Sequence, residues 1–577
     1  MQKLTPLLLV FLGLGLGLVV FRDSAAGQAL LAPQVDVGSG FTYQGRLDLE
    51  GAPADGTYDF QFRLFDAATG GSAVGTTVTV NDVDVEDGLF TVVLDFGANA
   101  FDGQARWLRI AVREGSSTGA YSTLSPRQSL TATPYALFAL QAGSVAWADV
   151  QNRPANVLVV AQSGGDYSSI QAALDGITDA GAANPYLVYV APGVYEEQVT
   201  LKPYVTLQGA GEESTIIHWT GGSQPPWEGA GSATLTGADN ASLRDLTLES
   251  DGAGEDFAVA LFNDGVSPTI SHVTARALNA GDTRGVAYYG GASGSISNVT
   301  AIAADGTRNH AITSDASSPK MRDMTAIASG GDASYAVLHW IGSTATMMGL
   351  IATASGGTNN FAVWVNGATP ILRDVAATAS GGSNSFGVYN LNSAAPVMNN
   401  VTASGLDATS NYGVFNLNAS PSMIDVRANA LGGTATRGVF NSNSSPQMVN
   451  VVVTASDGAA DNHGVYNYNS TSLSLTDVTI KASGSGSSNY AVSNEDSSPQ
   501  MTNVVATASG GANNYGAWNT GSSPLIRQSV LEGSTNSVYA SGGAVQVANS
   551  QLIGPVGAGV TCFDNYDQSL VAATCSP

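Results

Sequence analysis

Histidine is the most versatile side chain in this sequence, because an imidazole can bind a metal or move a proton near neutral pH. The five histidines are scattered without the spacing of a metal-binding cluster: His218, His272, His310, His339 and His463. His339 lies in the repeat after His310 but aligns with Ser314, so the repetition does not bring the two histidines together. We therefore expect each histidine to be a hydrogen-bonded structural residue.

Acidic residues that could hold a cation gather in one stretch. Asp251, Glu255 and Asp256 lie near Asp282, and carboxylate oxygens are the ligands that calcium prefers. Solvated carboxylates explain the same cluster, and we favour that interpretation over a calcium site. We expect no other cofactor, because the sequence contains no phosphate-binding loop, and the lack of a nucleophile elbow argues against a serine hydrolase.

An aromatic column could bind sugar rings. Its members recur at the repeat interval: Trp364, Tyr389, Phe415, Phe440, Tyr466 and Trp518. If these rings face outward they form a stacking surface and are the glycan-binding candidates; if they face inward they belong to the core. Several members are Phe, which favours the core interpretation.

The N-terminus predicts export. Lys3 precedes an apolar run from Leu7 to Phe21, and small residues follow at Ala25 and Ala29. Residues 1–29 therefore read as a secretory signal peptide, with an uncleaved anchor as the alternative. We expect a secreted, extracellular protein, either free or associated with the cell surface.

The two cysteines, Cys562 and Cys575, both lie near the C-terminus. In an exported protein such a pair predicts a disulfide, with free thiols as the alternative. The bond would close residues 561–577 into a C-terminal cap.

These candidate residues lie on a repeat. One apolar column recurs at steps of 25 to 27 residues: Ile270, Ile296, Met321, Met347, Leu372, Met398, Met423, Met448, Leu475, Met501 and Ile526. A period in this range is typical of a solenoid, and short β-type pieces between Gly, Asn and Ser predict a coil of three short strands. The sequence thus predicts an all-β chain with a parallel β-helix over residues 157–560, whose first coil is covered by a short helix at Ser168–Ile177.

Two polar columns accompany the apolar one. The first is Asn298, Asp323, Asp374, Asn400, Asp425, Asn450, Asp477 and Asn503, and the second is Asn390, Asn416, Asn441, Asn467, Asn494 and Asn519. Asn tolerates left-handed backbone angles at bends, and stacked amides can bond to one another along the axis. We favour these structural roles over a polar binding stripe.

Residues 41–137 form a separate module. Alternating apolar and polar residues, as in Tyr58–Phe65, between Gly and Asp turns predict an antiparallel β-sandwich-like module. The segment resembles a small β module at the start of bacterial surface proteins, which implies a presentation or assembly role. Residues 138–156 read as a linker, and Trp147–Val150 is similar to phage tail-fibre necks, which leaves monomer and trimer open.

The entrance to the β-helix resembles a known family. After Val157–Leu174, Gly193, Tyr195 and Glu197 form a Gly-x-Tyr-x-Glu element. This stretch, about residues 157–275, resembles pectin methylesterases within the pectin-lyase-like superfamily of right-handed parallel β-helices. The resemblance implies two catalytic aspartates, supporting glutamines and an arginine in a groove.

The catalytic elements of that family match poorly. Phe257 stands where the family's first catalytic element has a glutamine, and Asp282 is a faint echo of the next element. Asn309 and His310 stand near the position of the nucleophilic aspartate. Asp282 is the only catalytic candidate, and it cannot by itself supply a chemistry that needs two carboxylates. We therefore lean toward a protein without enzymatic activity.

The charge balance restricts the partners. The net charge is −25, with 21 basic and 46 acidic residues and no basic cluster, which argues against nucleic acid. We expect a secreted or surface-displayed β-helix that binds a polysaccharide or cell-surface glycan, or acts as an adhesive or structural rod. The alternative is a polysaccharide-active enzyme of the pectinesterase or pectate-lyase type with a divergent active site.

Overall fold

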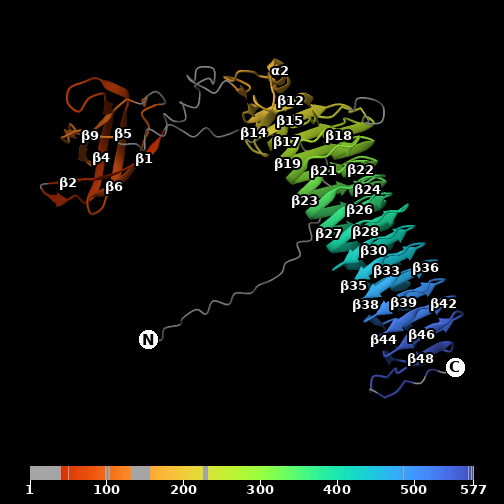
Figure 1. Ribbon diagram of the computed structural model, residues 1–577. Helices are drawn as coiled ribbons and strands as arrows, with labels where there is room; N and C mark the ends of the chain where they lie inside the picture. The colour runs from red at the N-terminus through yellow and green to blue at the C-terminus, as the bar shows by residue number, and fades with distance from the viewer. Residues whose placement is uncertain are drawn as a thin grey trace, which may run out of the picture. The chain divides into compact units, whose positions relative to one another are not determined.

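The computed structural model describes residues 40–49, 51–97, 100–101, 104–130, 156–224, 232–484, 486–569, 571–573 and 575. The chain divides into two compact units, Met1–Ser144 and Val145–Pro577 (Figure 1). The predicted signal peptide and, apart from Asn156, the predicted linker lie outside the described residues. Within the described ranges, no helix is long and apolar enough to cross a bilayer.

The N-terminal unit consists of antiparallel sheets around an aromatic core, as the alternating pattern predicts. The larger sheet has the order β5-β4-β7-β8 with β9 also on β7, while β1 pairs with β6 and β2 with β3. Phe60 and Phe90 stack in the core with ring centroids 4.3 Å apart. The strands are β1 (Phe41–Arg46), β2 (Asp48–Leu49), β3 (Ala52–Pro53), β4 (Gly56–Phe65), β5 (Ala73–Val85), β6 (Leu89–Leu94), β7 (Trp107–Glu114), β8 (Ser122–Thr123) and β9 (Gln128–Ser129).

The second unit is a parallel β-helix in which two long sheets face each other (Figure 1). One sheet has 14 strands, one from each coil. They are β13 (Val199–Thr200), β16 (Leu235–Thr236), β18 (Phe257–Asp264), β20 (Asp282–Tyr289), β22 (Arg308–Ser314), β24 (Ala333–His339), β26 (Asn359–Asn366), β28 (Asn384–Leu391), β30 (Ser410–Leu417), β33 (Ala435–Ser442), β36 (Asp461–Tyr468), β39 (Ser488–Glu495), β42 (Asn513–Thr520) and β45 (Asn536–Ser541).

The other sheet has 25 strands. They are β10 (Val157–Val160), β11 (Tyr186–Val190), β12 (Gly193–Glu196), β14 (Val205–Gly209), β15 (Thr215–Thr220), β17 (Ser242–Asp251), β19 (Thr269–Leu278), β21 (Ser295–Ala304), β23 (Lys320–Ser329), β25 (Thr346–Ser355), β27 (Ile371–Ser380), β29 (Val397–Leu406), β31 (Ser422–Ile424), β32 (Arg427–Leu431), β34 (Gln447–Val449), β35 (Val452–Ser456), β37 (Ser474–Thr476), β38 (Thr479–Ser483), β40 (Gln500–Thr502), β41 (Val505–Ser509), β43 (Leu525–Arg527), β44 (Val530–Gly533), β46 (Val545–Ala548), β47 (Gln551–Ile553) and β48 (Val560–Phe563).

The first Asn/Asp column forms the bend within this larger sheet. All eight predicted members have left-handed backbone angles, with φ between 51° and 56°. Up to β29 the long strand continues through the bend, while from β31 onward it divides there, which gives three strands per coil. The predicted backbone role of this column is therefore confirmed.

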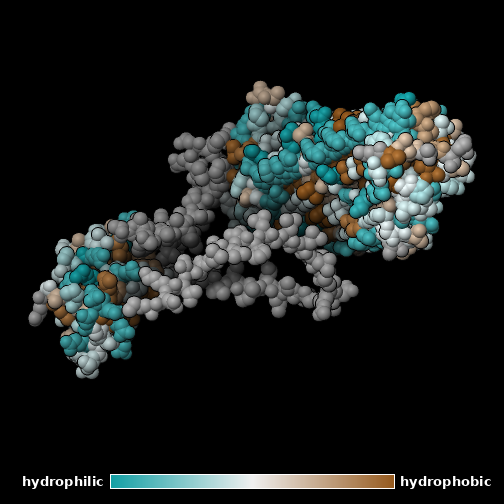
Figure 2. Space-filling view, turned by 90° about the horizontal axis from the view of Figure 1, so that it is seen from below, coloured by the Kyte–Doolittle hydropathy of each residue, from teal (hydrophilic) through white to brown (hydrophobic). Residues whose placement is uncertain are grey.

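The predicted apolar column lies in register inside the solenoid. Met321 pairs with Met347, and Met398 with Met423, on adjacent strands. Every member of the column is at most 2 % exposed. Figure 2 shows that both hydrophilic and hydrophobic residues reach the outer surface of the solenoid. Stacked apolar columns fill the interior because each coil can bury its side chains only against its neighbours.

The second Asn column forms a buried ladder of amides. Asn390 Nδ2 donates to Asn416 Oδ1 at 2.8 Å, and Asn416 donates in turn to Asn441 at 2.7 Å. The series continues through Asn467 and Asn494. Each amide satisfies the next, so the prediction of axial amide bonding is confirmed.

Helix α2 (Ile170–Gly176) covers the first coil. Ser169 is its N-cap, and its hydroxyl accepts from the Ala172 amide. The Glu197 carboxylate accepts from the amides of Ile170 and Gln171 at 2.7 and 2.9 Å. The Gly-x-Tyr-x-Glu element therefore fixes the cap, because its Glu satisfies otherwise unpaired amides at the helix N-terminus.

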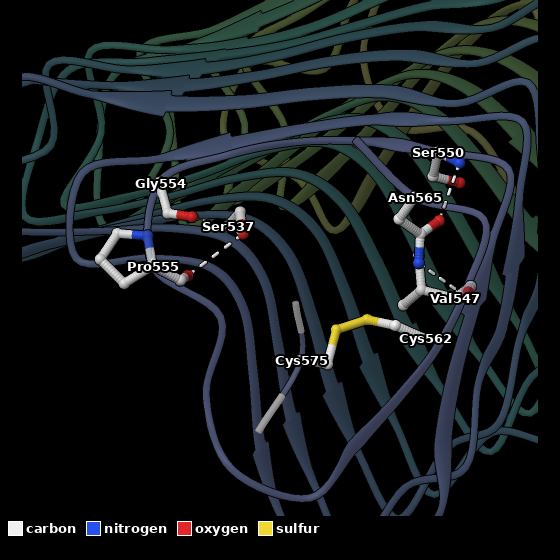
Figure 3. Close-up of a disulfide and its surroundings, with 8 residues drawn as sticks. All are labelled: Ser537, Val547, Ser550, Gly554, Pro555, Cys562, Asn565 and Cys575. Carbon is white, nitrogen blue, oxygen red and sulfur yellow. Dashed lines mark hydrogen bonds between the residues drawn. A yellow bond between two sulfur atoms is a disulfide. The ribbon is translucent and has the colours of Figure 1, made fainter. Parts of the chain in front are cut away.

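The C-terminal coil carries the disulfide between Cys562 and Cys575 (Figure 3). Both cysteines pack against the end of the core. Beside them, Asn565 Nδ2 donates to the Val547 carbonyl at 2.9 Å, and Asn565 Oδ1 accepts from the Ser550 amide at 2.8 Å. The bond thus ties the last turn of chain to β48.

Candidate functional site

The predicted aromatic column lies on the outer face of the 14-stranded sheet. All six rings are half-buried and none belongs to the solenoid interior, so the core interpretation is wrong. The rings from Trp364 to Tyr466 occupy consecutive coils, whereas Ser493 separates Tyr466 from Trp518.

A second aromatic row, which the sequence analysis missed, lies three residues earlier in each strand. Its rings stack almost face to face: Tyr335 on Phe361 at 4.9 Å, Phe361 on Phe386 at 4.9 Å, and Phe386 on Tyr412 at 4.8 Å. This spacing equals the distance between neighbouring strands. The 25-residue repeat of aromatic residues was the signal that could have found this row.

A small residue explains why positions three apart share one face. Gly387 separates Phe386 from Tyr389, and a Cβ there would come within 2.4 Å of the Ser404 amide nitrogen on the opposite sheet. The strand pairing omits this position. The close approach of the two sheets thus turns both Phe386 and Tyr389 outward, which strict alternation along a strand does not predict.

A pocket of about 390 Å³ lies at the N-terminal end of this aromatic face. Its lining combines charged groups with aromatic walls: Asp282, Arg284, Tyr289, Arg308, His310, Thr313, Asp315, Tyr335, Leu338, Trp340 and Trp364. The catalytic candidate Asp282 and the first ring of the predicted glycan-binding column therefore belong to one site.

Asp282 is held by two arginines from adjacent strands. Its carboxylate contacts Arg284 Nε at 2.8 Å and Nη2 at 3.2 Å, and Arg308 Nε at 3.4 Å. Burial acts to raise the pKa of Asp282, but the charge that His310 carries when protonated, the hydrogen bond and charge of Arg284 and the charge of Arg308 hold it below its usual value. Asp282 is therefore an anion at neutral pH.

His310 is buried beside this ion pair without a hydrogen-bond partner. Its Nε2 lies 3.7 Å from the Asp282 carboxylate, and neither ring nitrogen makes a hydrogen bond with the described residues. Burial lowers the pKa of His310 to about 3 despite the opposing effect of Asp282, so the ring is neutral at pH 7 and the arginines carry the local positive charge. The expectation that each histidine is satisfied is wrong for His310.

Asp315 supplies the second carboxylate that the sequence analysis did not find. It follows β22, in a turn rather than a motif, and lines the same pocket. Burial raises its pKa, and Arg284 opposes this effect. The pocket therefore holds two carboxyl groups whose pKa values move in opposite directions, which is the arrangement of an acid and a base in many active sites.

The acidic residues Asp251, Glu255 and Asp256 do not converge on a metal site. Asp256 meets Asp282 through the backbone, where its carbonyl accepts from the Asp282 amide at 2.8 Å. Among the residues described, no group of three or more His, Cys, Asp or Glu side chains is arranged to hold a metal ion. Solvated carboxylates stay the favoured interpretation of this cluster, with calcium as the alternative.

Known proteins match both units in part. Residues 156–279 match the Pectinesterase family, and residues 42–127 match "Domain of unknown function (DUF8740)". The curated protein "Putative pectinesterase 11" of Arabidopsis thaliana is 40% identical over 68 residues, which is 11% of this chain and 19% of that protein. The chain thus spans about a fifth of that relative's length.

Solved structures give weaker matches. The mannuronan C-5 epimerase AlgE6 A-module of Azotobacter vinelandii is 17% identical over 68% of this chain and 94% of that chain, with a TM-score of 0.29. Pectin methylesterase from carrot is 15% identical over 55% of this chain and 75% of that chain, with a TM-score of 0.23.

The Pectinesterase match ends at residue 279, so the whole pocket lies beyond it. The matched residues form the helix-capped first coils of the solenoid. From Val157 onward, the chain is a parallel β-helix whose first coils are similar to the Pectinesterase family.

Proposed function

We propose that this chain is an extracellular polysaccharide-binding β-helix whose ligand lies along the outer face of the 14-stranded sheet. The observation that carries the proposal is the outer aromatic column, whose rings from Trp364 to Tyr466 are half-exposed over consecutive coils and rest against the stacked, buried second row. Stacking on aromatic side chains suits sugar rings, whose faces are apolar. The Pectinesterase match of the first coils supports a polysaccharide as the ligand class.

The pocket adds a charged end to this surface. Two guanidinium groups, Arg284 and Arg308, share the pocket with the carboxyl groups of Asp282 and Asp315, and Arg308 is the more exposed of the two cations on a chain of net charge −25. Opposite charges attract over short distances even in salt. The proposed ligand therefore carries anionic groups, and Trp340 and Trp364 form the walls against which a sugar ring would rest.

Retention on immobilised polysaccharides tests the proposal. The full chain should be retained by a polyuronate gel and eluted by salt, and Trp364→Ala together with Tyr389→Ala should weaken retention at least tenfold. Phe563, which is 54% exposed in the larger sheet, gives the matched control Phe563→Ala. Unchanged retention of the double variant, or no retention of the folded wild-type chain on any glycan, would refute the proposal.

A second candidate function is a polysaccharide-active enzyme. It is favoured by the divergent pKa shifts of Asp282 and Asp315 in one pocket. In this role Asp315 would donate a proton and Asp282 would remain the anion. Methanol release and absorbance of unsaturated products from pectins test it, and both Asp282→Asn and Asp315→Asn should abolish any signal.

The N-terminal module would present the solenoid away from a cell surface. This role rests on the resemblance of residues 41–137 to modules of bacterial surface proteins. Cell fractionation of the producing organism and light scattering of the purified chain would test its location and separate monomer from trimer.

A further inference from the structure

The row that contains His310 repeats its polar residues further along the solenoid. Successive strand pairings place the following residues in one column: Arg284, His310, Tyr335, Phe361, Phe386, Tyr412, Arg437, His463, Tyr490 and Tyr515. An Arg–His–Tyr series thus occurs twice, six coils apart. At about 4.8 Å per coil, the two series are roughly 29 Å apart.

The similarity extends to the neighbouring residues. The first series begins with Asp282-Thr283-Arg284-Gly285-Val286 and the second with Ala435-Thr436-Arg437-Gly438-Val439. The two stretches differ only where Ala435 replaces Asp282. The same strand position therefore provides a counter-ion for the first arginine and none for the second.

The packing of the second series resembles that of the first. The His463 ring stacks on Tyr490 at 4.7 Å, as His310 stacks on Tyr335 at 4.7 Å. His463 Nδ1 is buried without a hydrogen-bond partner, like the ring nitrogens of His310. Each neutral ring therefore has a free nitrogen beside an arginine.

Arg437 differs from Arg284 in its charge balance. Its guanidinium donates to the Tyr412 hydroxyl at 3.0 Å and lies 5.4 to 5.8 Å from the centres of three rings, Tyr412, Phe440 and Tyr466. Its Nε has no partner, and no ion pair joins it to a carboxylate of the described residues. Two acids lie nearby: Asp461 pairs with Ala435 on the adjacent strand but forms no ion pair with Arg437, and Glu495 accepts from the Tyr466 hydroxyl at 2.9 Å.

A half-buried cation without a carboxylate partner is costly, because the Tyr412 hydroxyl and the neighbouring ring faces compensate its lost hydration only in part. We propose that Arg437, His463 and Tyr490 form a second binding subsite for an anionic group, a carboxylate or a sulfate, of a linear polysaccharide that also enters the Asp282 pocket. The half-buried rings of Tyr389 and Phe415 lie on coils between the two subsites and would contact the uncharged faces of the sugar rings. This inference rests on the proposed function and extends it.

Two linked subsites make a prediction about ligand length. A short oligosaccharide reaches one subsite, whereas a chain longer than roughly 29 Å reaches both. The second contact of the longer chain then forms within the complex and increases the overall affinity. Calorimetry of the full chain with uronate oligomers of about four and about twelve sugars should show at least tenfold tighter binding of the longer oligomer.

The chain itself supplies the decisive substitution. Ala435→Asp should neutralise Arg437 as Asp282 neutralises Arg284, and Arg437→Gln should remove the charge. Both variants should bring the long-to-short affinity ratio to within about threefold while binding of the short oligomer persists. The controls are Arg373→Gln, which removes an exposed arginine of the larger sheet, and Asn399→Asp, which adds a charge there.

The possible failures are separable. If no oligomer binds the folded chain, the proposed function fails and this inference fails with it. Oligomers could bind with a long-to-short affinity ratio near one, or with a ratio that Arg437→Gln and Ala435→Asp leave unchanged. Either result refutes the second subsite while the proposed function stands. Sulfated and uronate oligomers of equal length then distinguish the two anionic groups. If a neutral oligomer shows the same gain in affinity with length, the subsite is also refuted.

Discussion

Arg284 holds the Asp282 carboxylate through two hydrogen bonds of 2.8 and 3.2 Å, and both side chains are almost completely buried. Such a pair is costly to break, because the remaining partner becomes an uncompensated buried charge. The pair therefore holds both side chains in fixed positions in the lining of the pocket.

Replacement of Asp282 should loosen this part of the solenoid in a pH-dependent way. Asp282→Asn should reduce the local free energy of unfolding by about 3 kcal/mol at pH 7, because it removes the carboxylate that offsets the buried Arg284 charge. The folded-state pKa of Asp282 is lowered, so its stabilisation is complete above the unfolded value near 3.8 and is lost as pH falls through the folded value. Hydrogen exchange of the β20 and β22 amides measures this local free energy of unfolding, and its difference between variant and wild type should shrink below about pH 4. The exposed turn residue Asp305, as Asp305→Asn, is the control, and a difference that grows in acid would contradict the assignment.

The amide ladder should tolerate no apolar interruption. Asn441→Val leaves the Asn416 donor and the Asn467 acceptor unpaired in the interior, which should cost about 2–4 kcal/mol of local stability. Valine is sterically suitable, because Val365 occupies the same column. Denaturant titration with hydrogen exchange would measure the loss, and the exposed Asn513→Ala should stay within about 0.5 kcal/mol of wild type. Equal stability of Asn441→Val would show that the ladder contributes no net energy.

The first Asn/Asp column should accept only residues that tolerate left-handed backbone angles. Asn450 has φ 53°, and the same column contains Gly349 at φ 70°. Asn450→Val should therefore destabilise the coil by about 1–2 kcal/mol or more, whereas Asn450→Gly should be nearly neutral. Thermal unfolding of the two variants measures the difference, and equal midpoints would contradict a left-handed requirement at this position.

Loss of the disulfide should act only on the last coils. Cys575→Ser opens a loop of 13 residues, for which a stabilisation of about 3 kcal/mol is typical. Because each coil contacts only its neighbours, amide exchange should accelerate in β46–β48 and stay unchanged in β20–β30. Reduced wild-type protein should behave in the same way. Faster exchange throughout the solenoid would show that the C-terminal cap controls the stability of the whole unit.

The sequence by itself determined the solenoid. The Met321–Met448 column, the left-handed positions such as Asn450 and the Asn390–Asn519 ladder all follow from a period of 25 to 27 residues, because stacking coils places like residues over like. The short helix predicted within Ser168–Ile177 also follows from local sequence, because a serine precedes its first turn and its apolar face lies within one segment.

Only the tertiary structure decided the site. Whether Tyr389 faces outward depends on how closely the two sheets approach at Gly387, and local alternation contains no information about that distance. The meeting of Asp282 with Arg308 and Asp315 depends on neighbouring coils and a turn, because parallel stacking brings together residues that are a whole repeat apart in the sequence. The unpaired state of His310 likewise arises from what surrounds it in three dimensions, which its residue type and spacing do not specify.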